Sequence, residues 1–265
     1  MPNYKKELIS KNYKEPFVNP GMEKNQFFDI KPLKDWGIIW FPISMANIST
    51  KQGVKNCMEW IKFFGKKAGE PKIGLSTTYT DFLYLNSKET SRKLKEKFMI
   101  QMVAHKNGIK NEVHKNRNEL QIQHSFHFET WGNLYLEIEG DFNSYFRKIK
   151  EMYNKDKNFQ KFVKEDCRFY KRRLTPDQIN FFLEEHLMIY LILNMKVKFR
   201  NEYVQGREKW ILLVYPGVPP KGQVYLAQKN PFRFKTENKF LGQYNVENKR
   251  FYDFNNIDLE TWNYD

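Results

Sequence analysis

Cysteine is scarce in this chain of 265 residues, which contains only Cys57 and Cys167, far apart in the sequence. Two cysteines without a Cys-x-x-Cys pair indicate neither a disulfide framework nor a cysteine-ligated zinc site. We therefore expect a reduced, cytoplasmic setting. The N-terminal residues lack an apolar signal core, and no run of roughly 18 apolar residues occurs, so the sequence predicts no membrane span.

Glycine-rich nucleotide motifs are also missing. The sequence has no Gly-x-Ser-x-Gly turn, no Gly-x-x-x-x-Gly-Lys-Ser/Thr loop and no Gly-x-Gly-x-x-Gly turn, so it lacks the signatures of α/β-hydrolases, P-loop enzymes and dinucleotide-binding proteins. We expect no cofactor. His124 and His127 lie three residues apart, a spacing that places them on opposite faces of a strand, so we expect no metal site either.

Positive charge and aromatic side chains are abundant. The 45 Lys and Arg exceed the 31 Asp and Glu, giving a formal charge of +14, and 23 Phe, 15 Tyr and 6 Trp are enough for a sizeable core. A basic protein attracts polyanions such as nucleic acid. A simple compositional bias toward Lys and Asn explains the charge equally well, and the charge by itself leaves both interpretations open.

The hydrophobic pattern predicts one α/β domain. Residues 1–34 are polar and contain three prolines, which is typical of a surface arm, and residues 35–265 form the predicted domain. Residues 36–44 are almost wholly apolar, as in a strand covered on both faces of a parallel sheet. An amphipathic helix over 51–67 and a strand over 72–79 complete a β-α-β unit of a Rossmann-like sheet.

Further elements follow along the chain. We expect helices over residues 87–106, 142–153, 159–170 and 175–194, and strands over residues 210–215 and 223–228. Part of residues 119–128 alternates like a strand, and the tail after Pro231 shows no clear periodicity.

Ligands of open α/β sheets bind at the carboxyl ends of the strands. This rule selects Ser44, residues 79–81 and Tyr215. Ser44 follows the first strand directly, so its hydroxyl can act as a nucleophile with backbone N–H groups nearby for an oxyanion. A serine that only caps the following loop fits the spacing as well.

Two charged segments are further candidates. Glu184 and Glu185 lie in a mostly apolar helix, so we expect at least one carboxylate to point inward; the alternative is that both are solvated and His186 is an ordinary surface residue. The second segment is a basic helix, which either contacts phosphates or is a solvated face. Its basic residues are Lys88, Arg92, Lys93, Lys95 and Lys97.

These segments occur in an order that resembles the tRNA-dependent cyclodipeptide synthases. The matching stretches are Gly37-Ile-Ile-Trp-Phe-Pro-Ile-Ser44-Met-Ala-Asn47, the Lys-rich helix 88–97, Phe181-Phe-Leu-Glu-Glu185 and Val214-Tyr-Pro216. The resemblance spans about residues 36–229. It implies a Rossmann-like domain similar to the catalytic domains of tyrosyl- and tryptophanyl-tRNA synthetases, with a mostly parallel sheet flanked by helices.

The resemblance also implies an activity. A serine after the first strand, Ser44 here, accepts an aminoacyl group from one aminoacyl-tRNA, and a second aminoacyl-tRNA gives a dipeptidyl-enzyme that cyclises to a diketopiperazine. No ATP is used. Glu185 matches the carboxylate that anchors the amino group, Tyr215 positions the aminoacyl group, and the basic helix holds the tRNA.

The matches are incomplete at the helix that carries the acid. The family has a tyrosine four residues before its glutamate, and Phe181 stands there in this chain. Tyr190 or another tyrosine then supplies the hydroxyl, or the alignment is shifted so that Tyr190 is the family tyrosine. Tyr215-Pro216 resembles the Tyr-Pro branch, whereas Asn47 matches the other branch. A non-catalytic tRNA- or RNA-binding protein and a serine-dependent acyltransferase remain alternatives.

Overall fold

The computed structural model describes residues 36–67, 73–81, 83, 91–120, 126–138, 140–194, 196, 210–232 and 241–264. The predicted N-terminal arm, residues 1–34, lies outside this described part of the chain. Within it, no helix is both long and apolar enough to cross a membrane.

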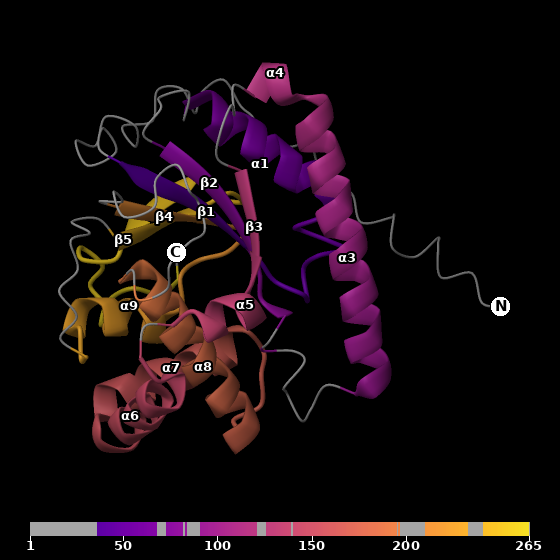
Figure 1. Ribbon diagram of the computed structural model, residues 1–265. Coiled ribbons are helices and arrows are strands. Elements are labelled where there is room, and N and C mark those ends of the chain that lie inside the picture. The colour runs from indigo at the N-terminus through magenta and orange to yellow at the C-terminus, as the bar shows by residue number, and fades with distance from the viewer. Residues whose placement is uncertain are drawn as a thin grey trace.

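A six-stranded sheet forms the centre of the described structure, in the order β3-β2-β1-β4-β5-β6 (Figure 1). Every neighbouring pair is parallel except β5 with β6, which is antiparallel. The strands are β1 (Gly37–Ile43), β2 (Ile73–Tyr79), β3 (Phe126–Thr130), β4 (Trp210–Tyr215), β5 (Leu241–Asn245) and β6 (Arg250–Asp253). The predicted mostly parallel sheet is confirmed.

Helices cover both faces of the sheet. One face packs on α1 (Val54–Lys67) and α3 (Arg92–Lys115), with the short α4 (Arg117–Leu120) beside them. The other face packs on α5 (Trp131–Leu136), α6 (Phe142–Lys155), α7 (Lys157–Phe169), α8 (Pro176–Leu193) and α9 (Lys221–Lys229). Alternate side chains of β1 enter the two cores, Ile38 and Trp40 on one face and Ile39 and Phe41 on the other. This explains why the strand is apolar throughout.

Local signals in the sequence place several helix starts. Thr175 caps α8 by accepting a hydrogen bond from the N–H of Gln178, and Pro176 occupies the first helical position; both residue types favour a helix start. Asp141 and Asp156 cap α6 and α7 in the same way. The predicted helices 142–153, 159–170 and 175–194 are confirmed within a few residues.

The predicted strand over residues 223–228 is wrong, because this segment belongs to helix α9. Its consecutive apolar residues, 224–227, are typical of a buried strand, but a distant carboxylate stabilises a helix: Asp166 accepts hydrogen bonds from the N–H groups of Lys221 and Gly222 at 2.7 and 2.8 Å. A carboxylate at a helix start satisfies N–H groups that have no partner within the helix. The neighbour of β4 is instead β5, from the tail without clear periodicity.

Two other boundaries differ from expectation. The predicted helix 87–106 runs from Arg92 to Lys115, capped by Ser91. Residues 84–90 lie outside the described residues. The partly alternating segment 119–128 contains the end of α4 and the start of β3, and residues 121–125 between them are likewise not described.

Candidate active site

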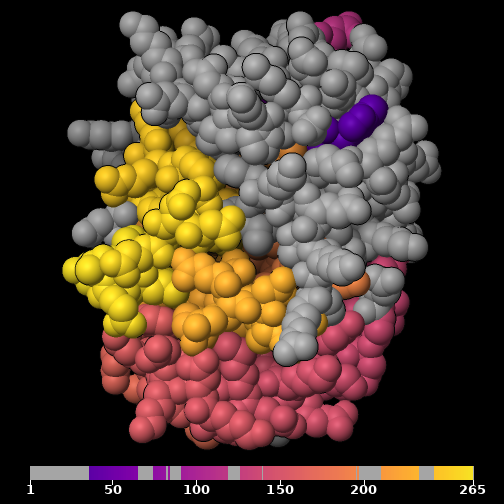
Figure 2. Space-filling view, turned by 90° about the vertical axis from the view of Figure 1, so that its left-hand side faces the viewer, coloured from indigo at the N-terminus to yellow at the C-terminus, as the bar shows by residue number. Residues whose placement is uncertain are grey.

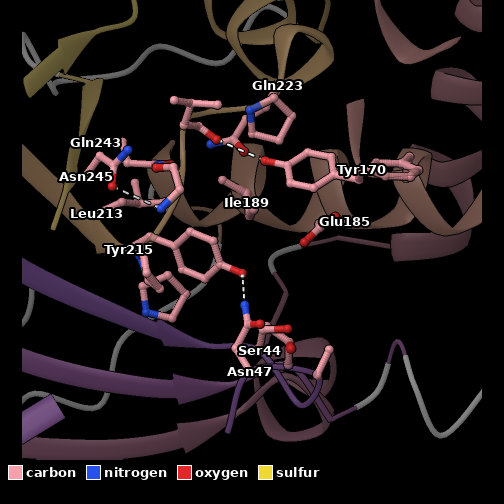
Figure 3. A pocket seen from close by; sticks show the side chains of 18 of the residues that line it. Ser44, Asn47, Tyr170, Glu185, Ile189, Leu213, Tyr215, Gln223, Gln243 and Asn245 are labelled. Atoms are coloured by element: carbon pink, nitrogen blue, oxygen red, sulfur yellow. Dashed lines mark hydrogen bonds between the residues drawn. The ribbon is translucent and has the colours of Figure 1, made fainter. Parts of the chain in front are cut away.

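A cavity of about 440 Å³ lies at the carboxyl ends of the parallel strands. The order in which strands are added to the sheet reverses there, since β2 lies on one side of β1 and β4 on the other, and such sheets bind ligands at this point. The loops after β1, β2, β4 and β5, the end of α7, α8 and the start of α9 all contribute (Figure 3). The predicted residues that line it are Ser44, Asn47, Phe181, Glu185, Tyr215 and Pro216.

Ser44 is held rigidly by Gln52, a residue that the sequence did not single out. The side-chain oxygen of Gln52 accepts a hydrogen bond from the N–H of Ser44 at 2.8 Å, and its amide nitrogen donates to the carbonyl of Pro42 at 2.6 Å. Gln52 is fully buried. Its amide therefore continues the hydrogen bonding of the strand past the end of β1 and fixes the backbone that carries the Ser44 hydroxyl.

The backbone of Gln52 is fixed in turn by His105 of α3. The ring Nε2 of His105 lies 2.7 Å from the carbonyl oxygen of Gln52, and Nδ1 lies 3.0 Å from the hydroxyl of Tyr79. A carbonyl only accepts, so Nε2 carries a proton. Burial lowers the pKa of His105, so the ring is neutral and Nδ1 accepts from Tyr79. The loop that carries Ser44 is thus attached to α3.

The backbone N–H groups of this loop are partly occupied. The N–H of Ser44 binds Gln52, and the N–H of Asn47 donates to the carbonyl of Ser44 at 2.9 Å. These two groups are not available to stabilise an oxyanion in this arrangement. An oxyanion formed at Ser44 requires other donors from the cavity wall.

Glu185 reaches the cavity from α8, and its carboxylate points into the space above Ser44 (Figure 3). Burial raises the pKa of Glu185, and Asp166 adds to this, while His186 and Arg172 act in the opposite direction. A carboxylate in such a position gains most by pairing with a cation. Glu184 lies elsewhere, near Tyr135 and Lys150, so the two glutamates occupy different environments. His186 is fully buried and paired with Asp166 at 3.1 Å.

Tyr215 ends β4 and its hydroxyl accepts a hydrogen bond from the side-chain nitrogen of Asn47 at 3.2 Å. The contact joins the loops after β1 and β4 across the cavity (Figure 3). The chain then turns through Pro216 and Gly217, which has a φ of +147°, a value that favours glycine. The turn aims the Tyr215 ring at Asn47.

The other tyrosines near α8 have different surroundings. Tyr190 does not line the cavity; it is buried and its hydroxyl donates to the side chain of Asn230. Tyr170, at the end of α7, does line the cavity, and its hydroxyl donates to the carbonyl of Val218 at 3.0 Å. Burial, with Tyr215 and Asp166 next in effect, raises the pKa of Tyr170. No sequence signal pointed to Tyr170, because only the packing of α7 against the loop after β4 places it there.

Residues 79–81, at the end of β2, have different surroundings. Tyr79 is buried under α3, Thr80 lines the cavity and Asp81 accepts a hydrogen bond from the N–H of Gly132 at 3.3 Å. His127 pairs with Glu129 at 2.6 Å, while His124 lies outside the described residues. Among the described residues, no three His, Cys, Asp or Glu side chains are grouped as in a metal site.

Four of the predicted basic residues lie in the first two turns of α3. Arg92, Lys93 and Lys97 are exposed and Lys95 is partly buried, whereas Lys88 is not among the described residues. Gln101 donates to the hydroxyl of Ser49, in the loop after Ser44, at 2.8 Å. Lys93, Lys97 and Gln101 are spaced four residues apart, so they share one face of α3. The helix face that meets the loop therefore continues into a pair of lysines.

Comparison with known proteins gives structural neighbours only. No protein-family model matches the sequence, and no curated protein matches it. Among solved structures, the chain is similar to a CDPS from Fluoribacter dumoffii (14% identity, 74% of this chain and 85% of that chain, TM-score 0.48) and to a CDPS from Staphylococcus haemolyticus (14%, 88% and 96%, 0.48). It is also similar to a cyclodipeptide synthase from Candidatus Glomeribacter gigasporarum bound to Phe-tRNAPhe (16% identity, 78% of this chain and 89% of that chain, TM-score 0.46). At these values the likeness assigns neither an activity nor a residue to this chain.

Proposed function

We propose that this protein is an aminoacyl-tRNA-dependent cyclodipeptide synthase in which Ser44 is the nucleophile. The observation that carries the proposal is that Ser44, Glu185 and Tyr215, from three separate segments, line one cavity at the carboxyl ends of β1 and β4. A hydroxyl and a carboxylate at opposite walls can hold an amino acid by its two ends. Ser44 takes the carbonyl carbon and Glu185 the ammonium group.

The reaction then proceeds in three transfers. The Ser44 oxygen attacks the ester carbonyl of the first aminoacyl-tRNA, forming a seryl ester and releasing the tRNA hydroxyl with the serine proton. The amine of this aminoacyl-enzyme attacks the ester of a second aminoacyl-tRNA, forming a peptide bond and releasing the second tRNA. The free amine of the dipeptidyl-enzyme attacks the seryl ester, closing the diketopiperazine and restoring the Ser44 hydroxyl.

The proposed roles of the surrounding side chains follow from their contacts. Tyr215, fixed by Asn47, forms the wall next to the reacting carbonyl. Phe181 lines the cavity without a hydroxyl, and Tyr170 brings a phenol to the same cavity. We assign the hydroxyl at this wall to Tyr170 rather than to Tyr190, whose hydroxyl is bonded away from the cavity. Tyr215-Pro216 favours the Tyr-Pro branch of the family.

Lys93 and Lys97 are proposed to hold the phosphates of the tRNA, with Arg92 and Lys95 beside them. The contact between Gln101 and Ser49 places this face of α3 next to the loop of the nucleophile. A non-catalytic tRNA-binding protein would share the basic helix but would not need Ser44. A serine acyltransferase acting on small thioesters would need Ser44 but not the basic helix.

The test is to incubate the purified protein with a mixture of charged tRNAs and to measure cyclic dipeptides by mass spectrometry. We expect products with the wild type and none with Ser44→Ala. Ser144→Ala, at the exposed start of α6, is the matched serine control and should retain full activity. Intact-mass analysis should show an aminoacyl adduct on the wild type that Ser44→Ala lacks. Cyclic dipeptide production by Ser44→Ala would overturn the assignment of the nucleophile.

A further inference from the structure

Three buried amide side chains form one wall of the cavity. Gln223 of α9 and Gln243 and Asn245 of β5 are 1%, 2% and 3% exposed, and all three line the cavity. Figure 3 shows Gln243 and Asn245 beyond Tyr215 as seen from Ser44, and Gln223 on the side of the cavity opposite Ser44. They therefore lie away from the proposed reacting atoms, where a substrate side chain would extend.

Two of these amides form hydrogen bonds with the backbone of Gly217. The side-chain nitrogen of Gln243 donates to the carbonyl of Gly217 at 2.7 Å, and the side-chain oxygen of Asn245 accepts from the N–H of Gly217 at 3.1 Å. These bonds hold the turn after β4. Gln243 and Asn245 thus have a structural role that needs no ligand.

Gln223 differs from its two neighbours. Its amide nitrogen is buried and has no hydrogen-bond partner among the described residues. Buried polar groups in proteins are nearly always paired, and those that are not require an explanation. Because Gln223 lines a cavity, a rotation of its side chain that brings the amide nitrogen to the cavity lets a ligand supply the missing acceptor.

The backbone at Gln223 is held in place by its neighbours. It lies on the first turn of α9, whose N–H groups at Lys221 and Gly222 are bound to the buried Asp166. Gly222 itself packs so closely that an added Cβ would lie 2.7 Å from the ring of His186. The backbone that carries Gln223 is therefore fixed, so only rotation about its side-chain bonds changes which groups the amide meets.

We propose that Gln223 determines substrate side-chain specificity by donating a hydrogen bond to a neutral, oxygen-bearing side chain, a hydroxyl or a carboxamide, of one of the two aminoacyl groups. This inference rests on the proposed function. The neutral amides Gln243 and Asn245 and the apolar Leu213 and Val218 line the same cavity, which suits a side chain with an apolar body and a neutral polar end. A site built to bond a hydroxyl strongly rejects the analogue that lacks it.

The test is a competition between matched amino acids, supplied as charged tRNAs in equal amounts: tyrosine against phenylalanine, threonine against valine, and asparagine against leucine. Cyclic dipeptides are quantified by mass spectrometry. We expect the wild type to prefer the oxygen-bearing member of at least one pair by tenfold or more. In Gln223→Leu this preference should fall below about twofold, while Gln160→Leu, on α7 outside the cavity lining, should retain it.

A second measurement separates recognition from folding. Because Gln223→Leu removes an unpaired buried donor, its thermal midpoint should equal or exceed that of the wild type. A lower midpoint with an unchanged preference would show that Gln223 is structural and would overturn the inference. Cyclic dipeptides formed without any such preference would overturn the inference and leave the proposed function intact. No cyclic dipeptide from any pair would overturn the proposed function, and the inference with it.

Discussion

Gln52 holds Ser44 in place through a 2.8 Å hydrogen bond from the Ser44 N–H to the Gln52 side-chain oxygen. The same side chain binds the carbonyl of Pro42, so one buried amide spans the end of β1. The position of the proposed nucleophile thus depends on a residue eight positions later in the chain.

Replacing this amide should impair both stability and activity. Gln52→Leu leaves the N–H of Ser44 and the carbonyl of Pro42 unpaired, and we expect a loss of about 2–3 kcal/mol in unfolding free energy. Displacement of the Ser44 hydroxyl should also lower cyclic dipeptide formation by roughly 10²-fold. Chemical denaturation and product analysis measure the two effects. Equal activity of Gln52→Leu and wild type would contradict a positioning role.

Glu184 should make the protein less stable as the pH rises. Burial raises the pKa of Glu184 from 4.5 to about 7, so between these values the folded state holds a proton that the unfolded state has released. Stability from this group is therefore present at low pH and is lost as the pH rises through about 7. The quantity to compare is the unfolding free energy of Glu184→Gln minus that of the wild type. Allowing for solvent screening, this difference should increase by about 2 kcal/mol from pH 5 to pH 8. Denaturation at both pH values gives this difference directly, and parallel pH profiles would rule the effect out.

Helix α3 should give the protein a salt-dependent affinity for tRNA. If Lys93 and Lys97 each neutralise a phosphate, Lys93→Ala combined with Lys97→Ala should weaken binding and reduce the slope of log K against log salt by about 1–2. Filter binding of charged tRNA at several salt concentrations measures the slope. Lys148→Ala with Lys155→Ala, two exposed positions on α6, is the charge-matched control. An equal loss in both double variants would point to net charge rather than to a specific surface.

Asp166 should be essential for the cavity wall formed by α9. This fully buried carboxylate accepts hydrogen bonds from the N–H groups of Lys221 and Gly222, from the Tyr264 hydroxyl at 2.8 Å, and is paired with His186. Figure 2 shows the C-terminal segment beside the α9 region on one face of the molecule. Asp166→Ala leaves these donors unpaired, and we expect a loss of about 3–5 kcal/mol, measured by chemical denaturation. Asp177→Ala, at the first turn of α8, should cost less than about 1 kcal/mol. Similar losses in both would contradict this role.

The sequence by itself determined the central β-α-β unit, the start of α8 at Thr175 and Pro176, and the position of Ser44 at a strand end. These features depend on local rules: an apolar run without alternation predicts a strand buried on both faces, and Thr, Asp and Pro at a helix start satisfy or omit N–H groups. The same rules failed at α9, where a short apolar run suggested a strand and a carboxylate 55 positions away in the chain stabilises a helix instead.

Only the tertiary structure decided which side chains share the cavity. Residues 44, 170, 185 and 223 come from four segments, and their distances follow from the packing of helices on the sheet rather than from spacing along the chain. For the same reason Tyr190, an equally eligible tyrosine in the sequence, turned out to bond Asn230 outside the cavity, while Tyr170 lines it. Hydrogen bonds such as Gln52 to Ser44 and the unpaired amide of Gln223 exist only once distant backbone segments are fixed together, because a polar group is satisfied or left unsatisfied by its neighbours in space.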